Sequence, residues 1–247
     1  MKFDHNKTFA GTRQSADERQ QEHQQQAEYG IREYILSVYQ YMALALIITA
    51  VTAAVVTSSA TFINFILHSP LQWILVLAPI TIVLSISGTI TKMSLLAAHT
   101  ALIIFAILIG LALASIFLIY TEHNMIRACL TIAATFAVMS MYGYQTERDL
   151  GKISSFLLMG VIGLIIAGLV GLFLPSSKLQ FMMSAIAVIV FTILTAYDTQ
   201  RIRNIYDQAS GNENLANKLA IYGALLLYTD LINVFMRWLQ QLSKRRY

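Results

Sequence analysis

Charged residues are scarce in this sequence of 247 residues. Only 12% of the residues are charged, whereas 57% are hydrophobic, and the mean hydropathy is +0.62. A soluble domain of this size carries about 25% charged residues. The composition therefore predicts a polytopic membrane protein with one membrane domain and argues against an ordinary soluble enzyme. The net charge of +4 is too small and too dispersed to indicate binding to nucleic acid.

Cysteine is almost absent as well. The single Cys129 lies in an apolar segment, so the chain cannot form a disulfide framework. A zinc site of the usual thiolate type is excluded for the same reason. We expect no resident cofactor.

Long apolar runs dominate the chain after residue 34. A run of about 20 residues is long enough to cross roughly 30 Å of hydrocarbon. A backbone in lipid must satisfy its own hydrogen bonds, and the strict alternation of a membrane β-barrel is missing, so we predict an all-α protein. Seven spans are expected, at residues 35–58, 71–91, 97–120, 128–145, 156–175, 181–203 and 219–240. Pro79 should bend the second of them.

Residues 1–30 differ from the rest of the chain. The stretch "DERQQEHQQQAEYG" is polar and rich in glutamine, and it cannot bury enough apolar surface to fold alone. We interpret residues 1–30 as a cytoplasmic tail that is disordered or loosely helical, and residues 31–247 as the seven-helix membrane domain. The tail is a solvated extension or, alternatively, a docking site for a partner such as a membrane-bound protease.

Basic residues predict the orientation. Arg127 and Lys178 are the only basic residues in the loops that face away from the tail, whereas eleven lie in the tail or in loops on its side. The positive-inside rule therefore predicts a cytoplasmic N-terminus. The C-terminal "SKRRY" conflicts with this rule, because seven spans place it on the far side; a re-entrant segment near the end would remove the conflict.

Two acidic residues, Asp198 and Asp230, lie inside apolar runs, whereas the other eleven acids lie in tails or loops. An ionisable group deep in a membrane costs about 2.5–3.5 kcal/mol on insertion scales and commonly faces a cavity or a partner. Two carboxylates in contact share a proton and titrate as a unit. The alternative is two separate anchors, with Asp198 paired to Arg201 and Asp230 hydrogen-bonded to Tyr228 or Asn233.

Four stretches carry a resemblance to a known family. "LTAYDTQRIRN" and "LYTDLINVF" surround the two aspartates, and "YGYQTERDLG" and "ITKMS" lie between spans. Together they resemble the transmembrane Bax-inhibitor-motif family, in its bacterial YccA/YbhL-like branch, over residues 30–245. The resemblance implies seven helices with the last helix central and the other six around it, in the inner membrane of a bacterium.

The resemblance also implies a function. Bacterial members are described as pH-sensitive calcium leaks gated by two aspartates on the last two helices, which correspond to Asp198 and Asp230. A basic residue at the cytoplasmic end of the second helix latches the pair shut, and Lys92 corresponds to it. Two carboxylates make at most a weak calcium site, which suits conduction because an ion must also leave.

Three classes of function follow from these observations. The first is a pH-gated leak for calcium or other cations, and the second is a non-conducting stress regulator that modulates a membrane protease through its tail. The third is an intramembrane protease, which we do not expect, because the second aspartate lies in "YTDL" without the required glycine context. His99, at the start of the third span, is expected to be a polar residue at a helix edge rather than a catalytic base.

Overall fold

The structure is a computed structural model that describes residues 5–59, 71–119, 122–173, 176–209 and 211–244. In these ranges the chain forms helices and no strands. The long helices are α1 (His5–Thr57), α3 (Leu71–Thr89), α4 (Leu95–Ile119), α5 (Glu122–Gln145), α6 (Ser154–Phe173), α7 (Ser177–Ala209) and α8 (Glu213–Lys244). A short 3-10 helix, η1 (Leu150–Ile153), precedes α6.

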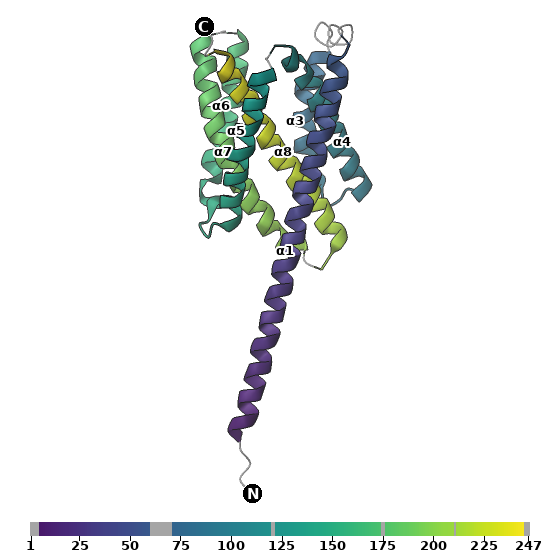
Figure 1. Cartoon of the computed structure of the whole chain (residues 1–247), viewed down its shortest axis with the longest axis vertical. Helices are drawn as coiled ribbons and strands as arrows, with labels where there is room; N and C mark the ends of the chain where they lie inside the picture. Colours follow the sequence, from purple (N-terminus) through teal and green to yellow (C-terminus); the bar gives the residue numbers. More distant parts are fainter. Residues whose placement is uncertain (1–4, 60–70, 120–121, 174–175, 210, 245–247) are drawn as a thin grey trace.

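These helices confirm the predicted all-α membrane architecture. Six of the described helices are long and apolar enough to cross a membrane, and α3, with 19 residues, occupies the remaining expected span. The helix α3 continues through Pro79. The helices α7 and α8 are continuous over 33 and 32 residues, so neither is a re-entrant segment. Because α1 begins and α8 ends at opposite ends of the molecule, the seven helices cross the bundle in alternating directions (Figure 1).

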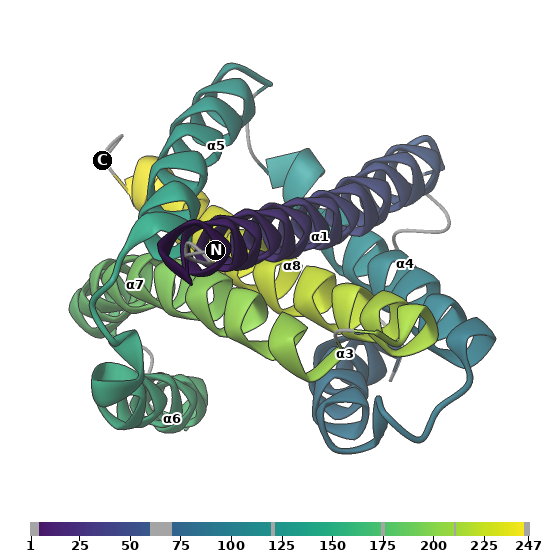
Figure 2. The same ribbon diagram turned by 90° about the horizontal axis from the view of Figure 1, so that it is seen from below.

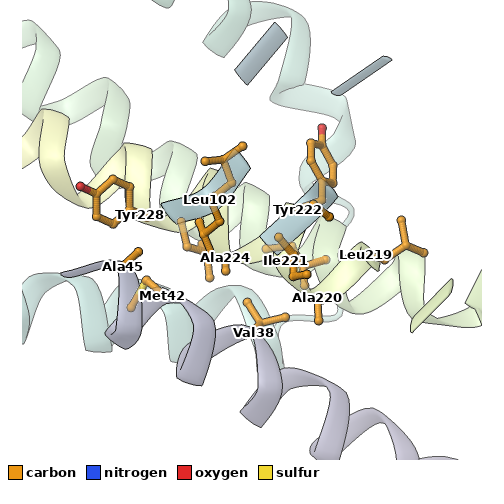
Figure 3. Packing of buried hydrophobic residues seen from close by; sticks show 14 of the residues in the cluster. Val38, Met42, Ala45, Leu102, Leu219, Ala220, Ile221, Tyr222, Ala224 and Tyr228 are labelled. Carbon is orange, nitrogen blue, oxygen red and sulfur yellow. The ribbon is translucent and has the colours of Figure 1, made fainter. Parts of the chain in front are cut away.

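The last helix is central, as expected. The helix α8 runs diagonally through the bundle and packs against α1, α3, α4, α5 and α7 (Figures 1 and 2). Its apolar side chains form the largest core cluster with residues of α1 and α4, and Figure 3 shows Val38 and Met42 of α1 beside Ala220 and Ala224 of α8. The largest part of the core therefore surrounds α8.

The expected ring of six helices around α8 is incomplete. The helix α6 lies at the periphery, where it packs against α7 and η1 (Figure 2). Its large apolar side chains are exposed; the exposed fractions of Phe156, Leu158 and Met159 are 61–72%. The glycine-rich surface of α6 is therefore used only in part for close packing, since Gly163 and Gly171 have open space around them.

The polar N-terminal segment is helical in the structure. The helix α1 begins at His5 and continues into the first span without a break at residue 30. Its first turns extend away from the bundle (Figure 1). An isolated polar helix of this length is marginal in water, so its continuity with the membrane-spanning part of α1 supplies the nucleus that it lacks.

Capping residues define the turn between α7 and α8. Asn212 precedes α8, and its Oδ1 atom accepts a hydrogen bond of 3.0 Å from the backbone of Leu215, as an N-cap does. Gly211 has a φ of 87°, a left-handed conformation that favours glycine. The turn therefore reverses the chain sharply and places α7 and α8 side by side in antiparallel directions.

Candidate functional site

The α7–α8 pair brings the two predicted aspartates together. Asp198 is 5% exposed and Asp230 is 2% exposed, and their carboxyl groups lie within hydrogen-bonding reach of each other. Two buried carboxyl groups in contact favour a state in which they share one proton, because two negative charges so close together repel each other. The geometry is therefore that of a proton-sharing pair inside the bundle.

Asp198 and Asp230 lie at different distances along their helices from the α7–α8 turn, and the tilt of α8 offsets this difference. Asp198 lies 11 residues before the end of α7 (209 − 198), which corresponds to about 16 Å of helix, and Asp230 lies 17 residues after the start of α8 (230 − 213), about 25 Å. Two parallel helix axes would leave the side chains about 9 Å apart in depth. The diagonal path of α8 through the bundle reduces this difference in depth (Figure 1).

The partners expected for Asp230 as a separate anchor are engaged elsewhere. The Tyr228 hydroxyl bonds the Thr49 hydroxyl at 2.6 Å, and the Asn233 amide donates to the Thr229 carbonyl at 2.9 Å. The Oδ2 atom of Asp230 is buried and has no hydrogen-bond partner among the described residues. This oxygen is available to a proton, a water molecule or a passing cation.

Arg201 is the basic residue that acts on the pair electrostatically, through Asp198 one turn earlier in α7. Its guanidinium lies 5.9 Å from the centre of the Tyr222 ring and donates to the Tyr222 hydroxyl at 3.4 Å. The same hydroxyl is 3.1 Å from the Ser87 hydroxyl. Arg201 therefore connects the aspartate pair to α8 and to the last turn of α3.

Lys92, the expected latch, lies in the turn between α3 and α4. Its side chain is exposed, and its described contact is a backbone hydrogen bond to Thr89. The structure therefore does not bring Lys92 into contact with Asp198 or Asp230 in this conformation. Ser87, five residues earlier, is the residue of α3 that joins the polar network.

Gln200 joins the aspartate helix to the "YGYQTERDLG" stretch. Its side chain accepts a hydrogen bond from the Leu150 backbone at 2.9 Å and donates to the carbonyls of Arg148 and Thr146 at 2.8 and 3.4 Å. Arg203 adds a bond of 2.7 Å to the Tyr144 carbonyl. The end of α5 and the following loop are therefore attached to α7 directly beyond Asp198.

Hydroxyl groups join three helices on the α5 side of the pair. Ser140 contacts Thr199 at 3.0 Å and also bonds the Tyr39 hydroxyl of α1. Gly143 allows this approach, because a Cβ atom there would lie 2.2 Å from the Ala196 carbonyl oxygen. The backbones of α5 and α7 are therefore in near contact two residues from Asp198.

The donor set does not fit a tight metal site. No group of three or more His, Cys, Asp or Glu side chains gathers anywhere in the described part of the chain. Calcium takes six to eight oxygen ligands in stable sites, and the pair offers four. The arrangement suits transient contact with a cation that keeps most of its water.

His99 has an ordinary structural role. Its ring nitrogens contact the Leu95 carbonyl at 2.9 Å and the Tyr41 hydroxyl at 3.3 Å. Both nitrogens are thus engaged at the start of α4.

Sequence reasoning missed Gln200 and Arg237. The bonds of Gln200 run to a distant backbone, so local pattern gives no signal for them. Arg237 did leave a signal, since "NVFMRWLQQL" places a basic residue within the apolar last run. Only the acidic residues within the spans were considered, although a basic residue inside a span indicates a functional site as strongly as an acidic one.

Comparisons with known proteins agree with this architecture. The family described as "Inhibitor of apoptosis-promoting Bax1" matches residues 31–247. The inner membrane protein YbhL of Escherichia coli K12 is 36% identical over 224 residues, which covers 90% of this chain and 95% of YbhL. An uncharacterized protein of Rickettsia prowazekii is 41% identical over 88% of this chain and 92% of its own length. An uncharacterized membrane protein of Streptococcus pyogenes is 27% identical over 87% of this chain and 94% of its own length.

Proposed function

Because this chain belongs to the family of the inhibitor of apoptosis-promoting Bax1, and because its last two helices hold a buried aspartate pair, we propose that it is a pH-sensitive leak for calcium or similar cations. It would act in the inner membrane of a bacterium with its N-terminus in the cytoplasm, as a passive conductor rather than an enzyme. The observation that carries the proposal is the contact between Asp198 and Asp230 in the centre of a membrane bundle.

The proton that the pair shares supplies the gate. When both carboxylates are ionised, their charge attracts Arg201 and holds α3 through Tyr222 and Ser87. When the pair takes up a proton, this attraction weakens and α3 is released. Calcium is attracted by the same charges, and the small number of oxygen ligands lets it leave again.

The α7–α8 turn carries a feature that favours cations. A groove of about 600 Å³ lies between α1, the end of α7 and the start of α8. Its lining includes Glu33 and Glu213, and none of its described lining residues is Lys, Arg or His. A cleft lined by charges of one sign concentrates the opposite ion. We therefore place the entrance for cations at this end of the bundle.

Calcium flux from purified protein in liposomes tests the proposal. Flux through the parent protein should change between about pH 6 and 8, because a coupled carboxylate pair titrates far above a free aspartate. Asp198→Asn removes one charge, keeps the shape of the side chain and should abolish the pH response. Glu147→Gln, the same kind of change on an exposed loop residue, should leave the response intact. If Asp198→Asn responds like the parent, Asp198 is a structural anchor and the proposal fails.

The projecting start of α1 supports a second proposal. Its polar turns extend beyond the bundle, where a soluble domain or a membrane protease can reach them (Figure 1). A regulator that works through this segment loses partner binding when residues 1–27 are deleted, whereas a leak keeps its flux. Flux and partner binding measured on the same deletion therefore separate the two functions.

A further inference from the structure

Arg237 is a basic residue in the membrane-spanning part of α8. It lies seven residues after Asp230, which is two helical turns or about 10 Å along the axis, on the same face of the helix. Its side chain is half-buried. The direction from Asp230 to Arg237 leads away from the α7–α8 turn, toward the end of the bundle where α8 finishes (Figure 1).

Neutral groups hold this guanidinium in place. Its Nη1 atom donates to the Gln240 side-chain oxygen at 3.3 Å, and that oxygen also accepts a bond of 3.2 Å from the Ser184 hydroxyl of α7. Ser184 is 3% exposed. In the described ranges no carboxylate pairs with Arg237. Arginine stays protonated in proteins, so a full positive charge lies on α8 beside Gln240, whose side chain reaches Ser184 of α7.

A small void lies between the aspartate pair and this charge. A partly open void of about 10 Å³, enough for the centre of one water molecule, lies between α5, α7 and α8. Thr195, one turn before Asp198, and Leu231, next to Asp230, line it at one side; Val234, one turn before Arg237, lines it at the other. Thr135 and Thr192 also line it, and its remaining lining residues, Ile132, Phe136 and Met139, are apolar. The void therefore lies between the pair and Arg237.

We propose that Arg237, positioned by Gln240 and Ser184, is a fixed electrostatic barrier at the far end of the cation path, which limits the leak and opposes divalent ions more than monovalent ones. The proposal rests on the proposed leak function and adds its second control point. The protonation of the aspartate pair controls whether the path is open, and the charge of Arg237 limits the rate at which a cation of a given charge leaves it.

The energy of a cation near a fixed charge scales with the charge of the ion. If removal of the Arg237 charge raises monovalent flux by about threefold, the same change raises divalent flux by about the square of that factor, close to tenfold. The alternative role of Arg237 is to reach the lipid phosphates at the membrane edge, as long basic side chains do near helix ends. An anchor of that kind does not alter the ratio of divalent to monovalent flux.

The experiment compares calcium and potassium flux into the same liposomes for Arg237→Gln, Arg237→Lys and the parent. The ratio of the two fluxes is independent of the amount of folded protein. We expect the calcium-to-potassium ratio to rise about threefold in Arg237→Gln and to stay near the parent value in Arg237→Lys. Lys178→Gln removes an exposed positive charge at the same end of the bundle and should leave the ratio unchanged.

The possible outcomes separate this inference from the proposed function. If the parent conducts with a pH response and Arg237→Gln keeps the parent ratio, the barrier is wrong and the leak stands. If the parent is silent but Arg237→Gln conducts calcium, the barrier is supported as the dominant block and the pH gate is not. If neither protein conducts at any pH, there is no cation path for Arg237 to control, and both the proposed leak and the proposed barrier are wrong.

Discussion

Gly143→Ala should destabilise the bundle at the α5–α7 contact two residues from Asp198. The added Cβ atom would lie 2.2 Å from the Ala196 carbonyl oxygen, 2.8 Å from its carbon and 2.9 Å from its Cα atom. All three neighbours belong to the backbone of α7, so no flexible side chain can move aside. The two helices must separate by roughly 1 Å, and overpacking of this kind costs about 1–3 kcal/mol.

The separation should also affect the polar contacts around the site. The Ser140–Thr199 contact of 3.0 Å spans the same pair of helices and would lengthen beyond hydrogen-bonding distance. We expect the melting temperature in detergent to fall by about 3–9 °C, from the usual relation between stability and melting temperature for chains of this size.

Gly163→Ala is the matched control for this experiment. It adds the same methyl group to a membrane-spanning helix, but no atom lies within 4 Å of the new Cβ position. Because alanine also favours the helix, its melting temperature should be equal to that of the parent or slightly higher. Equal melting temperatures for the two variants would refute the close α5–α7 approach and, with it, the position of Asp198 described above.

Two further predictions concern the groups around the pair. Arg201→Gln should raise calcium flux above pH 7, where the carboxylates are ionised, and change it little at low pH. Lys92→Gln should behave like the parent, because the described contact of Lys92 is to Thr89 and not to either aspartate; the reverse pattern in the same flux assay would restore Lys92 as the latch. Gln200→Ala removes the side chain that holds the loop after α5, so the backbone amides of residues 148–150 should exchange their hydrogens about 5- to 30-fold faster. Gln145→Ala is the control and should leave this hydrogen exchange unchanged. Unchanged exchange in Gln200→Ala would show that the loop does not depend on Gln200.

Much of the architecture is predictable from the sequence because lipid simplifies the problem. A backbone in hydrocarbon must form a helix, so apolar length alone locates each span, and the predicted 71–91 and 156–175 lie close to α3 and α6. The polar extensions of α7 and α8 are longer than hydropathy indicates. Residues 204–209 and 213–218 remain helical because the turn at Gly211 and Asn212 connects two helices that pack against each other.

The candidate site is predictable only in its members. Asp198 and Asp230 can be identified because they are the two acidic residues within apolar runs, and ionisable residues in membrane spans are rare and commonly functional. Their contact depends on the tilt of α8, which no local pattern encodes. The partner of the pair is less predictable still, because Arg201 and Lys92 are both basic residues near the ends of predicted spans, and only packing places Arg201 against Tyr222.

The central claim is that Asp198 and Asp230 hold one proton between them and release it in the pH range of gating. Infrared difference spectroscopy of the purified protein measures this directly, because a protonated carboxyl group has a carbonyl stretch that an ionised carboxylate lacks. We predict a protonated-carboxyl band that disappears between about pH 6 and 8, in parallel with the change in flux, and that is absent or shifted out of this range in Asp230→Asn. A band that is unchanged in Asp230→Asn, or no protonated carboxyl at any pH above 5, would contradict the shared proton and the gate built on it.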